Sequence, residues 1–230
     1  MIIGNGLIGS ALKKTLKHHE NLLVFVSGVA NSKEEDFEQY KKEFTLLEET
    51  LKIYKGKKLI YFSTCSISLK NESAYIKHKN NIENYICNNV DDYLIIRIPN
   101  IVGNSTNKHQ LVNYFLDCLI NQISITINVD CIRYLIDVDD LSKIIELLVT
   151  SKVKPSIINA AFDNGIKLEE LLMYLEDATE ITFKEIIKVS KGIDYTIDNA
   201  AFLKLIKNES YFNSNAKVIV NKYFTKNDKK

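Results

Sequence analysis

The stretch that decides the fold is MIIGNGLIG, residues 1–9. A short apolar run ends at Ile3, and Gly4, Gly6 and Gly9 follow at the spacing Gly-x-Gly-x-x-Gly, directly before a helical pattern. A strand, a glycine turn and a helix in this order let the backbone approach a pyrophosphate, and the helix N-terminus favours its negative charge. The pattern predicts dinucleotide binding. The alternative is a tight strand-to-helix turn that binds nothing.

Further apolar runs follow this first unit, at residues 22–27, 58–64 and 93–98, and helical patterns separate them. The runs are apolar throughout, which is typical of parallel strands buried on both faces. Their alternation with helices predicts βαβ units with right-handed crossovers. We therefore expect an α/β fold with a reduced Rossmann-type doubly wound parallel sheet.

A regular apolar seam runs through the predicted helix at residues 36–54. Its members step by three and four residues, as one face of a helix requires: Phe37, Tyr40, Phe44, Leu47, Leu51 and Tyr54. Such a seam predicts a surface that pairs with a second copy of the chain. The alternative is that the seam only covers the sheet.

The remainder of the chain predicts a smaller structure beside the sheet. Helical patterns occur at residues 110–122, 139–150, 167–176 and 199–206, with an apolar run at 157–161. We expect residues 1–150 to form the Rossmann-type dinucleotide-binding domain. Residues 151–230 are expected to form a small C-terminal α+β substrate lobe.

The composition narrows the function further. The 230 residues are 46% hydrophobic and 26% charged, close to globular averages, which disfavours disorder and fibrous classes. A net charge of +1 lacks the attraction that holds a protein on nucleic acid or an anionic membrane, and no apolar run is long enough for a membrane span. Four scattered cysteines indicate neither a metal site nor a disulfide framework. A reducing, cytoplasmic location fits best.

A tyrosine and a lysine four residues apart form a second feature. Tyr75 and Lys79 lie on one face of a predicted helix, shortly after a strand that ends in Ser63 and Thr64. A phenol is a weak base at neutral pH unless a nearby ammonium favours its ionised form. The trio Thr64, Tyr75 and Lys79 therefore predicts acid–base chemistry. The alternative is a group of polar surface residues at a helix start.

With these motifs in order, the chain resembles the extended short-chain dehydrogenases/reductases, the NAD-dependent epimerase/dehydratase family that acts on nucleotide sugars. The resemblance covers nearly the whole chain and is carried by these segments: residues 4–9, 27–30, 63–64, 75–79, 97–103 and 133–140. It implies a nucleotide-sugar oxidoreductase of the ketoreductase or epimerase type, serving surface polysaccharide biosynthesis. It also implies NAD or NADP as cofactor, and a homodimer.

The resemblance assigns roles to particular residues. It implies Tyr75 as the general acid/base, Thr64 as a hydrogen-bond partner of the reacting oxygen, and Lys79 as the charge that favours phenolate. The implied cofactor contacts are Gly4, Gly6, Leu7, Ile8, Gly9, Ser27, Gly28, Val29 and Lys79. Asn100 and Arg133 match positions that contact the substrate's phosphates, and no residue is implied as a metal ligand. Arg97, inside an apolar strand end, is expected to be structural.

One departure from the family bears on the cofactor. The first predicted helix runs directly into the strand at residue 22, where the family has two further βα units. The missing second strand normally carries the side chain that binds the adenosine ribose or a 2′-phosphate. An alternative function is therefore a non-catalytic subunit, related to these enzymes, that binds a sugar nucleotide or forms dimers.

Overall fold

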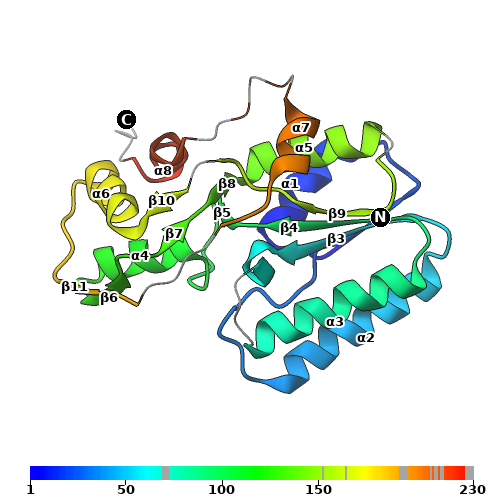
Figure 1. Ribbon diagram of the computed structural model, residues 1–230, viewed down its shortest axis with the longest axis horizontal. Coiled ribbons are helices and arrows are strands. Elements are labelled where there is room, and N and C mark those ends of the chain that lie inside the picture. The colour runs from blue at the N-terminus through cyan, green and yellow to red at the C-terminus, as the bar shows by residue number, and fades with distance from the viewer. Residues whose placement is uncertain are drawn as a thin grey trace.

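The computed structural model describes residues 1–68, 73–151, 153–163, 165–191, 196–207, 209, 212 and 215–225. Within these residues, no helix is both long and apolar enough to cross a membrane. The chain forms two parts, a layered α/β part and a smaller part beside it (Figure 1).

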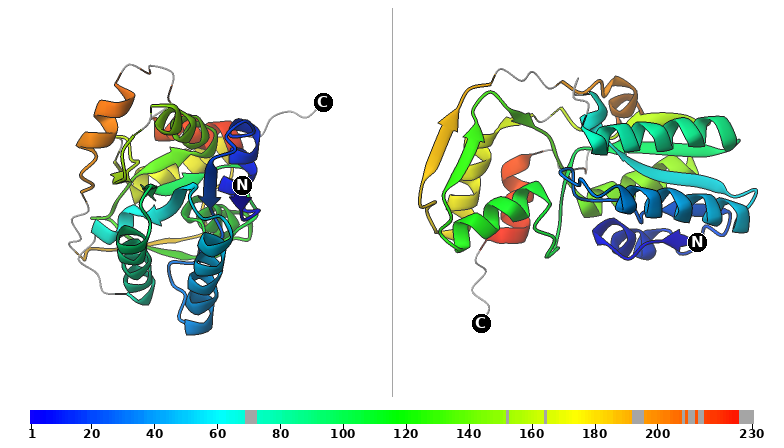
Figure 2. Two further views of the ribbon diagram at one scale, coloured as in Figure 1. Left: turned by 90° about the vertical axis from the view of Figure 1, so that its right-hand side faces the viewer. Right: turned by 90° about the horizontal axis from the view of Figure 1, so that it is seen from below.

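A five-stranded parallel sheet forms the centre of the first part. Its strands lie in the order β1-β2-β3-β4-β9, with these bounds: β1 Ile2–Ile3, β2 Leu22–Phe25, β3 Lys58–Thr64, β4 Tyr93–Ile98 and β9 Ser156–Asn159. The α/β fold class predicted from the sequence is confirmed. In the described part of the chain, β1 has no neighbour on its outer side, so the strand that carries the glycine turn is an edge strand (Figure 2).

Helices cover both faces of this sheet, because alternate strand residues point to opposite sides. Strand residues such as Ile60 and Ile96 pack on one face against α1 (Leu7–Thr15), α5 (Val138–Thr150) and α7 (Ala200–Ile206). The other face packs against α2 (Phe37–Ile53) and α3 (Ala74–Asn89), through residues such as Tyr61. Asp36 caps α2 by accepting a hydrogen bond from the Glu38 amide at 2.9 Å.

The crossovers that join the first strands differ in handedness, which corrects one sequence prediction. Steps from β1 to β2 and from β2 to β3 run in the same direction across the sheet, yet α1 and α2 lie on opposite faces. The two connections therefore have opposite hands. Crossovers through α2 and α3 share one face, and about 98% of such connections are right-handed. The exception is the crossover through α1, which is left-handed.

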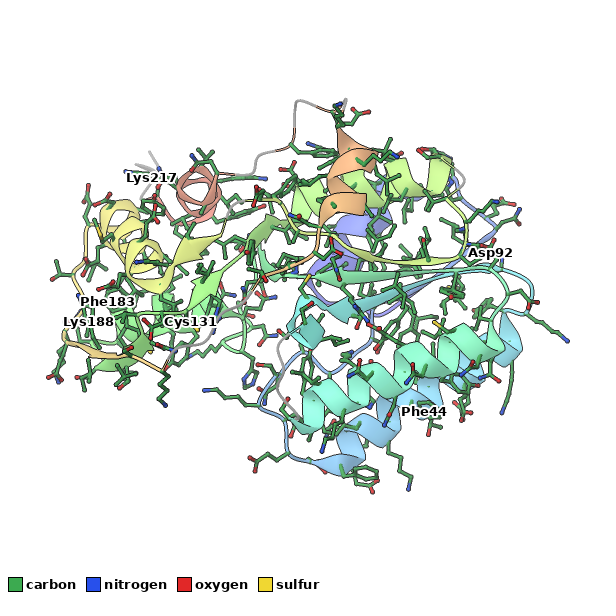
Figure 3. The ribbon with its side chains drawn as sticks, in the orientation of Figure 1. Phe44, Asp92, Cys131, Phe183, Lys188 and Lys217 are labelled. Atoms are coloured by element: carbon green, nitrogen blue, oxygen red, sulfur yellow. The ribbon has the colours of Figure 1, made fainter. Side chains whose placement is uncertain are left out.

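The second part has a separate hydrophobic core between helices and short strand pairs. Cys131 and Phe183 belong to this core and lie in the same region of Figure 3. Its helices are α4 (Leu111–Ile120), α6 (Leu168–Thr179) and α8 (Ala216–Phe224). Its strand pairs are β6 (Ile125–Asn128) with β11 (Ile186–Val189), and β7 (Ile132–Arg133) with β10 (Ile166–Lys167). A pair formed by β5 (Asn100–Val102) and β8 (Leu135–Asp137) connects the two parts.

The predicted boundary at residue 150 does not follow the division between the two parts. Residues 111–133 already belong to the second core, whereas β9 and α7 return to the main sheet. β9 is an apolar strand that completes the sheet beside β4, and that pairing was not evident from local sequence. Each part is therefore assembled from segments on both sides of residue 150.

The seam of the predicted helix at residues 36–54 faces inward. Leu47 is fully buried in the core between the sheet, α2 and α3, with Phe44, Leu51 and Tyr54 packed around it. The Phe44 ring meets the Tyr85 ring of α3 edge-on, with centroids 4.9 Å apart (Figure 3). The seam thus covers the chain's own sheet, and only Phe37 at its start is exposed.

Candidate functional site

A cleft of about 1610 Å³ opens at the carboxyl ends of the parallel strands. Ligands in open α/β sheets bind where successive connections leave for opposite faces. Here α1 and α2 part to opposite faces after β1 and β2, so the crevice lies between the glycine turn and the loop that follows β2. The second part closes the cleft with residues such as Tyr114 and Arg133.

The structure brings nearly all the sequence-predicted site residues together around this cleft. Twelve of the thirteen line it: Gly4, Gly6, Leu7, Ile8, Ser27, Gly28, Val29, Thr64, Tyr75, Lys79, Asn100 and Arg133. Gly9 lies directly beneath, where an added Cβ would come within 2.5 Å of the Gly4 carbonyl oxygen. Gly9 therefore has a packing role under the turn.

The glycine turn has the geometry of an anion-binding loop. Gly4 has a φ of +118°, and a Cβ there would come within 2.7 Å of the Val26 backbone, so only glycine fits. Gly6 begins α1 and faces open space, with no atom within 4 Å of a built Cβ. No side chain among the described residues caps α1, so the amides of its first turn are left for a ligand.

Lys79 has a partner that sequence reasoning missed. Its Nζ donates to Glu43 Oε1 at 2.8 Å and to the Tyr61 hydroxyl at 2.9 Å. Lys79 is 3% exposed and Glu43 4%, so the ion pair is enclosed. The Tyr61 hydroxyl also donates to Glu43 Oε1 at 2.8 Å, closing a triangle of three polar groups.

Both oxygens of the Glu43 carboxylate are hydrogen-bonded within the described part of the chain. Its second oxygen accepts from the Val29 amide at 2.7 Å and lies 3.0 Å from His78 Nε2. Burial alone would raise the pKa of Glu43, but the Lys79 ammonium and the hydrogen bonds from His78, Lys79 and Val29 lower it to about 2. The carboxylate is therefore charged at any working pH.

Tyr75 does not have the electrostatic environment that the sequence predicted. The expectation was that Lys79 would favour the phenolate. Instead, the pKa of Tyr75 is raised to about 12: burial raises it, a hydrogen bond with Thr64 lowers it in part, and the Glu43 carboxylate raises it again. The Lys79 Nζ lies 5.9 Å from the Tyr75 ring centroid, but its charge is paired with Glu43. Tyr75 is thus held as a neutral phenol.

A buried hydroxyl beside this group is left without a partner. Ser63, 4% exposed, lines the cleft, and its Oγ forms no hydrogen bond with any described residue. Lys79 has three N–H donors, and among the described residues only Glu43 and Tyr61 accept from it. These unused hydrogen-bonding groups indicate that the site is built for a polar ligand.

The two arginines have different roles. Arg97 forms a two-pronged ion pair with Glu83, at 2.9 Å from Nε and 2.5 Å from Nη2, as expected of a structural residue. Arg133 lines the cleft and donates to the Ile132 carbonyl at 3.1 Å, but it forms no ion pair within the described chain. Asn100 is fixed beside it, since its Nδ2 donates to the Tyr134 carbonyl at 3.0 Å. Arg133 is therefore available to an anion.

The described residues contain no cluster of three or more His, Cys, Asp or Glu side chains placed to hold a metal ion, and all four cysteines are free thiols.

The missed residues carried a signal in the sequence. Glu43 follows Tyr40 by three positions and precedes Leu47 by four, so it lies on the buried face of α2. A carboxylate buried in that way requires a cation or several hydrogen-bond donors nearby. Tyr61 and Ser63 lie on the same face of β3 as each other, because side chains alternate along a strand.

The parallel sheet, the glycine turn and the cleft define a Rossmann-type α/β protein. The sequence matches no protein-family model, and a search of curated proteins found no significant match. Solved structures, in contrast, match nearly the whole chain. At identities of 14–16% the likeness shows the fold alone. The matched structures are dehydratases, reductases and epimerases, enzymes of the kind that the sequence resembles.

Three of the matched structures illustrate this likeness. A dTDP-4-dehydrorhamnose reductase from Clostridium acetobutylicum matches with a TM-score of 0.74 and 14% identity, over 96% of both chains. A dTDP-glucose 4,6-dehydratase from Bacillus anthracis, in complex with NAD, matches with a TM-score of 0.68 and 16% identity. The match covers 95% of this chain and 78% of the dehydratase. A UDP-glucose 4-epimerase from Thermus thermophilus, in complex with NAD, matches with a TM-score of 0.67 and 16% identity. The match covers 94% of this chain and 82% of the epimerase.

Proposed function

We propose that the chain is a nucleotide-sugar oxidoreductase of the ketoreductase or epimerase type, with NAD or NADP as cofactor, and that it works in the cytoplasm. The observation that carries the proposal is the convergence of three features on one cleft: the glycine turn, the Thr64–Tyr75 pair, and Arg133, which forms no ion pair with a described residue. Solved structures of the same fold hold NAD or NADPH and include nucleotide-sugar enzymes.

The residues fit a nicotinamide dinucleotide on the side of the glycine turn. Gly6 leaves open space for a pyrophosphate at the start of α1, and the third N–H of Lys79, which no described residue accepts, would reach a ribose hydroxyl. When bound, this cofactor supplies or accepts a hydride. Tyr75 would exchange a proton with the substrate oxygen, and Thr64 would hold that oxygen in place.

The acidic groups favour reduction or epimerisation over loss of water. Dehydration of a sugar needs a general acid for the departing hydroxyl in addition to a base. The carboxylates that line the cleft, within the described residues, are Glu34 and Glu35 on the loop before α2. Glu34 is engaged by the amides of Glu35 and Asp36 at 3.0 Å. Glu35 is exposed to solvent on the same loop, so Thr64 and Tyr75 are the more enclosed groups for acid–base work.

Replacing Arg133 tests whether its guanidinium binds the phosphates of the sugar nucleotide. Arg133→Met is expected to weaken binding of UDP- and dTDP-linked sugars about 10- to 150-fold, because hydrogen bonds to charged groups contribute about 1.5–3 kcal/mol. Isothermal titration calorimetry with the sugar nucleotides measures this. Lys188→Met is the control, since Lys188 lies in the same part of the chain, pairs with Glu169 and is outside the cleft. Equal affinity in both variants would refute the placement of the phosphates.

One observation favours the second candidate, a non-catalytic sugar-nucleotide-binding subunit. The Glu43–Lys79 pair leaves Tyr75 without the ammonium that would ionise it. A panel of nucleotide sugars and both cofactors, read by thermal shift and by cofactor absorbance at 340 nm, separates the candidates. Sugar-nucleotide binding without any cofactor oxidation or reduction would support the subunit.

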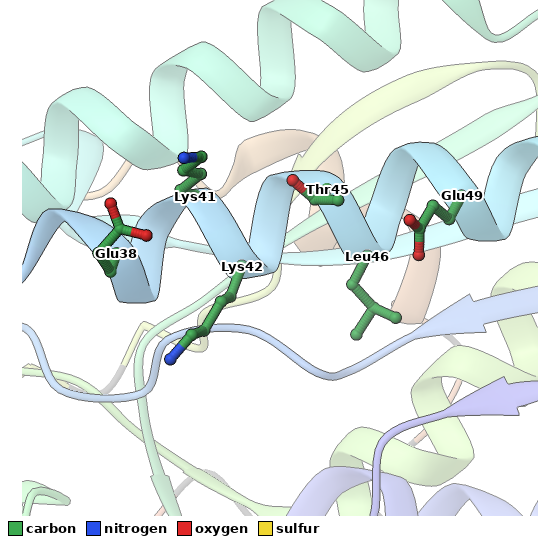
Figure 4. A pocket seen from close by; sticks show the side chains of 6 residues that line it. All are labelled: Glu38, Lys41, Lys42, Thr45, Leu46 and Glu49. Atoms are coloured by element: carbon green, nitrogen blue, oxygen red, sulfur yellow. The ribbon is translucent and has the colours of Figure 1, made fainter.

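A homodimer through α2 and α3 is part of the proposal. The inward seam does not support it, but the outer face of α2 exposes Ile53 (72%) and Leu46 (37%). Leu46 lies in a shallow groove of about 250 Å³ among charged side chains of α2 (Figure 4). The remaining lining residues are Glu38, Lys41, Lys42, Thr45 and Glu49.

Light scattering at micromolar concentration is expected to give a dimer mass. Leu46→Glu should shift the mass toward the monomer, because it places a charge at the centre of the interface. Met173→Lys, a change at an exposed position on α6, is expected to leave the mass unchanged. A monomer mass for the unaltered chain would rule out the dimer.

A further inference from the structure

Glu43 lies behind the cleft and holds two elements that line it. It accepts from the Val29 amide in the loop after β2 and pairs with Lys79 on α3. Gly28 packs against the same pair, and a Cβ there would come within 2.9 Å of both Glu43 Oε1 and Lys79 Nζ. Glu43 does not itself line the cleft, so a substitution there would act on the cofactor side through Val29 and Lys79.

We propose that Glu43 is a positioning residue that keeps Tyr75 a proton donor, so that the site reduces a ketone on the sugar and only slowly oxidises an alcohol. This inference rests on the proposed function and specifies its direction. It distinguishes a ketoreductase from an epimerase, whose first step is oxidation of an alcohol.

The electrostatic argument starts from the ion pair. Opposite charges 2.8 Å apart in an enclosed site act at longer range as a dipole, so the field of the Lys79 ammonium at Tyr75 is largely cancelled by Glu43. The described groups that act on Tyr75 are Thr64, a neutral hydroxyl, and the Glu43 carboxylate, which raises its pKa. Tyr40 and Tyr61 are phenols whose own pKa values are raised, and His78 Nε2 lies 3.0 Å from Glu43 Oε2.

Ketone reduction and alcohol oxidation need Tyr75 in different protonation states, the neutral phenol and the phenolate respectively. In reduction, a reduced nicotinamide cofactor would supply the hydride that adds to the carbonyl carbon. The C=O electron pair would move to the oxygen, and that oxygen would take the proton from the Tyr75 hydroxyl. The phenolate left behind is reprotonated from water. Oxidation of an alcohol runs these transfers backwards and needs Tyr75 as phenolate at the outset, a form that is scarce at neutral pH when the pKa is raised to about 12.

The test measures the ionisation of Tyr75 directly. Glu43→Gln is expected to lower the Tyr75 pKa by about one, a tenfold increase of phenolate at a given pH, because Lys79 is then uncompensated. Nuclear magnetic resonance of ¹³C-labelled tyrosine reports the titration, and Tyr75→Phe identifies the signal. The maximal rate of alcohol oxidation, measured at neutral pH with saturating alcohol and oxidised cofactor, should rise by up to the same factor.

The matched control is Glu83→Gln. Glu83 is as buried as Glu43 and also belongs to an ion pair, with Arg97, but it lies outside the cleft lining. It should cost comparable stability and leave the Tyr75 titration unchanged. Glu43→Gln/Lys79→Gln removes both charges and should restore a titration close to that of the unaltered protein.

Lys79→Gln provides a second arm if Glu43→Gln does not fold. It leaves Glu43 uncompensated and should raise the Tyr75 pKa. The inference is overturned if neither variant moves the titration, or if Glu83→Gln moves it equally. Because the titration uses neither cofactor nor substrate, a protein without activity could still show the shift. In that case the proposed function would fail and the role of Glu43 toward Tyr75 would stand.

Discussion

Replacing Tyr75 by Phe is expected to lower turnover about 100- to 10,000-fold, the usual effect of removing a general acid or base. The fold and the affinity for the sugar nucleotide should be retained, because the ring remains and Thr64 is the hydrogen-bond partner that is lost. Steady-state kinetics with a keto-sugar nucleotide and reduced cofactor measures the effect. A Tyr75→Phe protein that turns over at the normal rate would exclude Tyr75 as the proton donor.

Two comparisons make this result specific. Tyr54→Phe, on the packed side of α2, should cost only packing and leave turnover unchanged. The rate of reduction should also stay level from neutral pH to well above pH 9. The donor form of Tyr75 is the protonated one, and this form is lost only as the pH rises through its pKa of about 12. A fall of the rate near pH 7 would point to a different donor.

Cofactor binding is expected to be weak and almost indifferent to the 2′ position. In the described chain β1 is the outermost strand, so no neighbouring strand on that side offers a group to the adenosine ribose or to a 2′-phosphate. The loss of one or two charge-assisted hydrogen bonds costs roughly 1.5–3 kcal/mol each and weakens binding roughly 10- to 10,000-fold. Calorimetric titrations with NAD and NADP should both give dissociation constants in the high micromolar to millimolar range.

The glycine turn supplies the control for this measurement. Gly6 has a φ of −67°, which any residue adopts, and no atom lies within 4 Å of a built Cβ. Gly6→Val should therefore keep the melting temperature and abolish cofactor binding, because the side chain fills the space for the pyrophosphate. Tight and selective binding of one cofactor would show that β2 does the work of the missing strand. Binding of neither, with sugar nucleotides still bound, would favour the non-catalytic subunit.

Much of the site could be predicted from the sequence because its signals are local. The glycine spacing at residues 4–9 requires a particular backbone shape, and Tyr75 and Lys79 are four residues apart on one helix. Both were therefore visible without knowledge of the tertiary structure. The absence of two βα units was visible in the same way, because the first helix runs directly into the strand at Leu22.

What the sequence did not show depends on contacts between distant residues. Glu43 and Lys79 are 36 positions apart, and the sequence pairs Lys79 with Tyr75 only because those two are neighbours on a helix. Likewise, the apolar seam of α2 is a property of one helix, and the sequence alone does not say whether a sheet or a second chain covers it. In each case the local sequence pattern allowed two partners: Tyr75 or Glu43 for Lys79, and a second chain or the sheet for the seam. Only the tertiary structure shows which partner is in contact.

The left-handed crossover through α1 has a consequence for how a sheet of this kind can be shortened. With a right-handed connection, α1 would share a face with α2 and α3, and the loops after β1 and β2 would leave the sheet on the same side. The crevice would then be closed, and the apolar residues of the opposite face would lose the cover that Leu12 and Leu16 give them. The strands of this sheet follow one another in a single direction, from β1 to β9. The rare left-handed crossover at the β1 edge is therefore what keeps the cleft between the loops after β1 and β2 open.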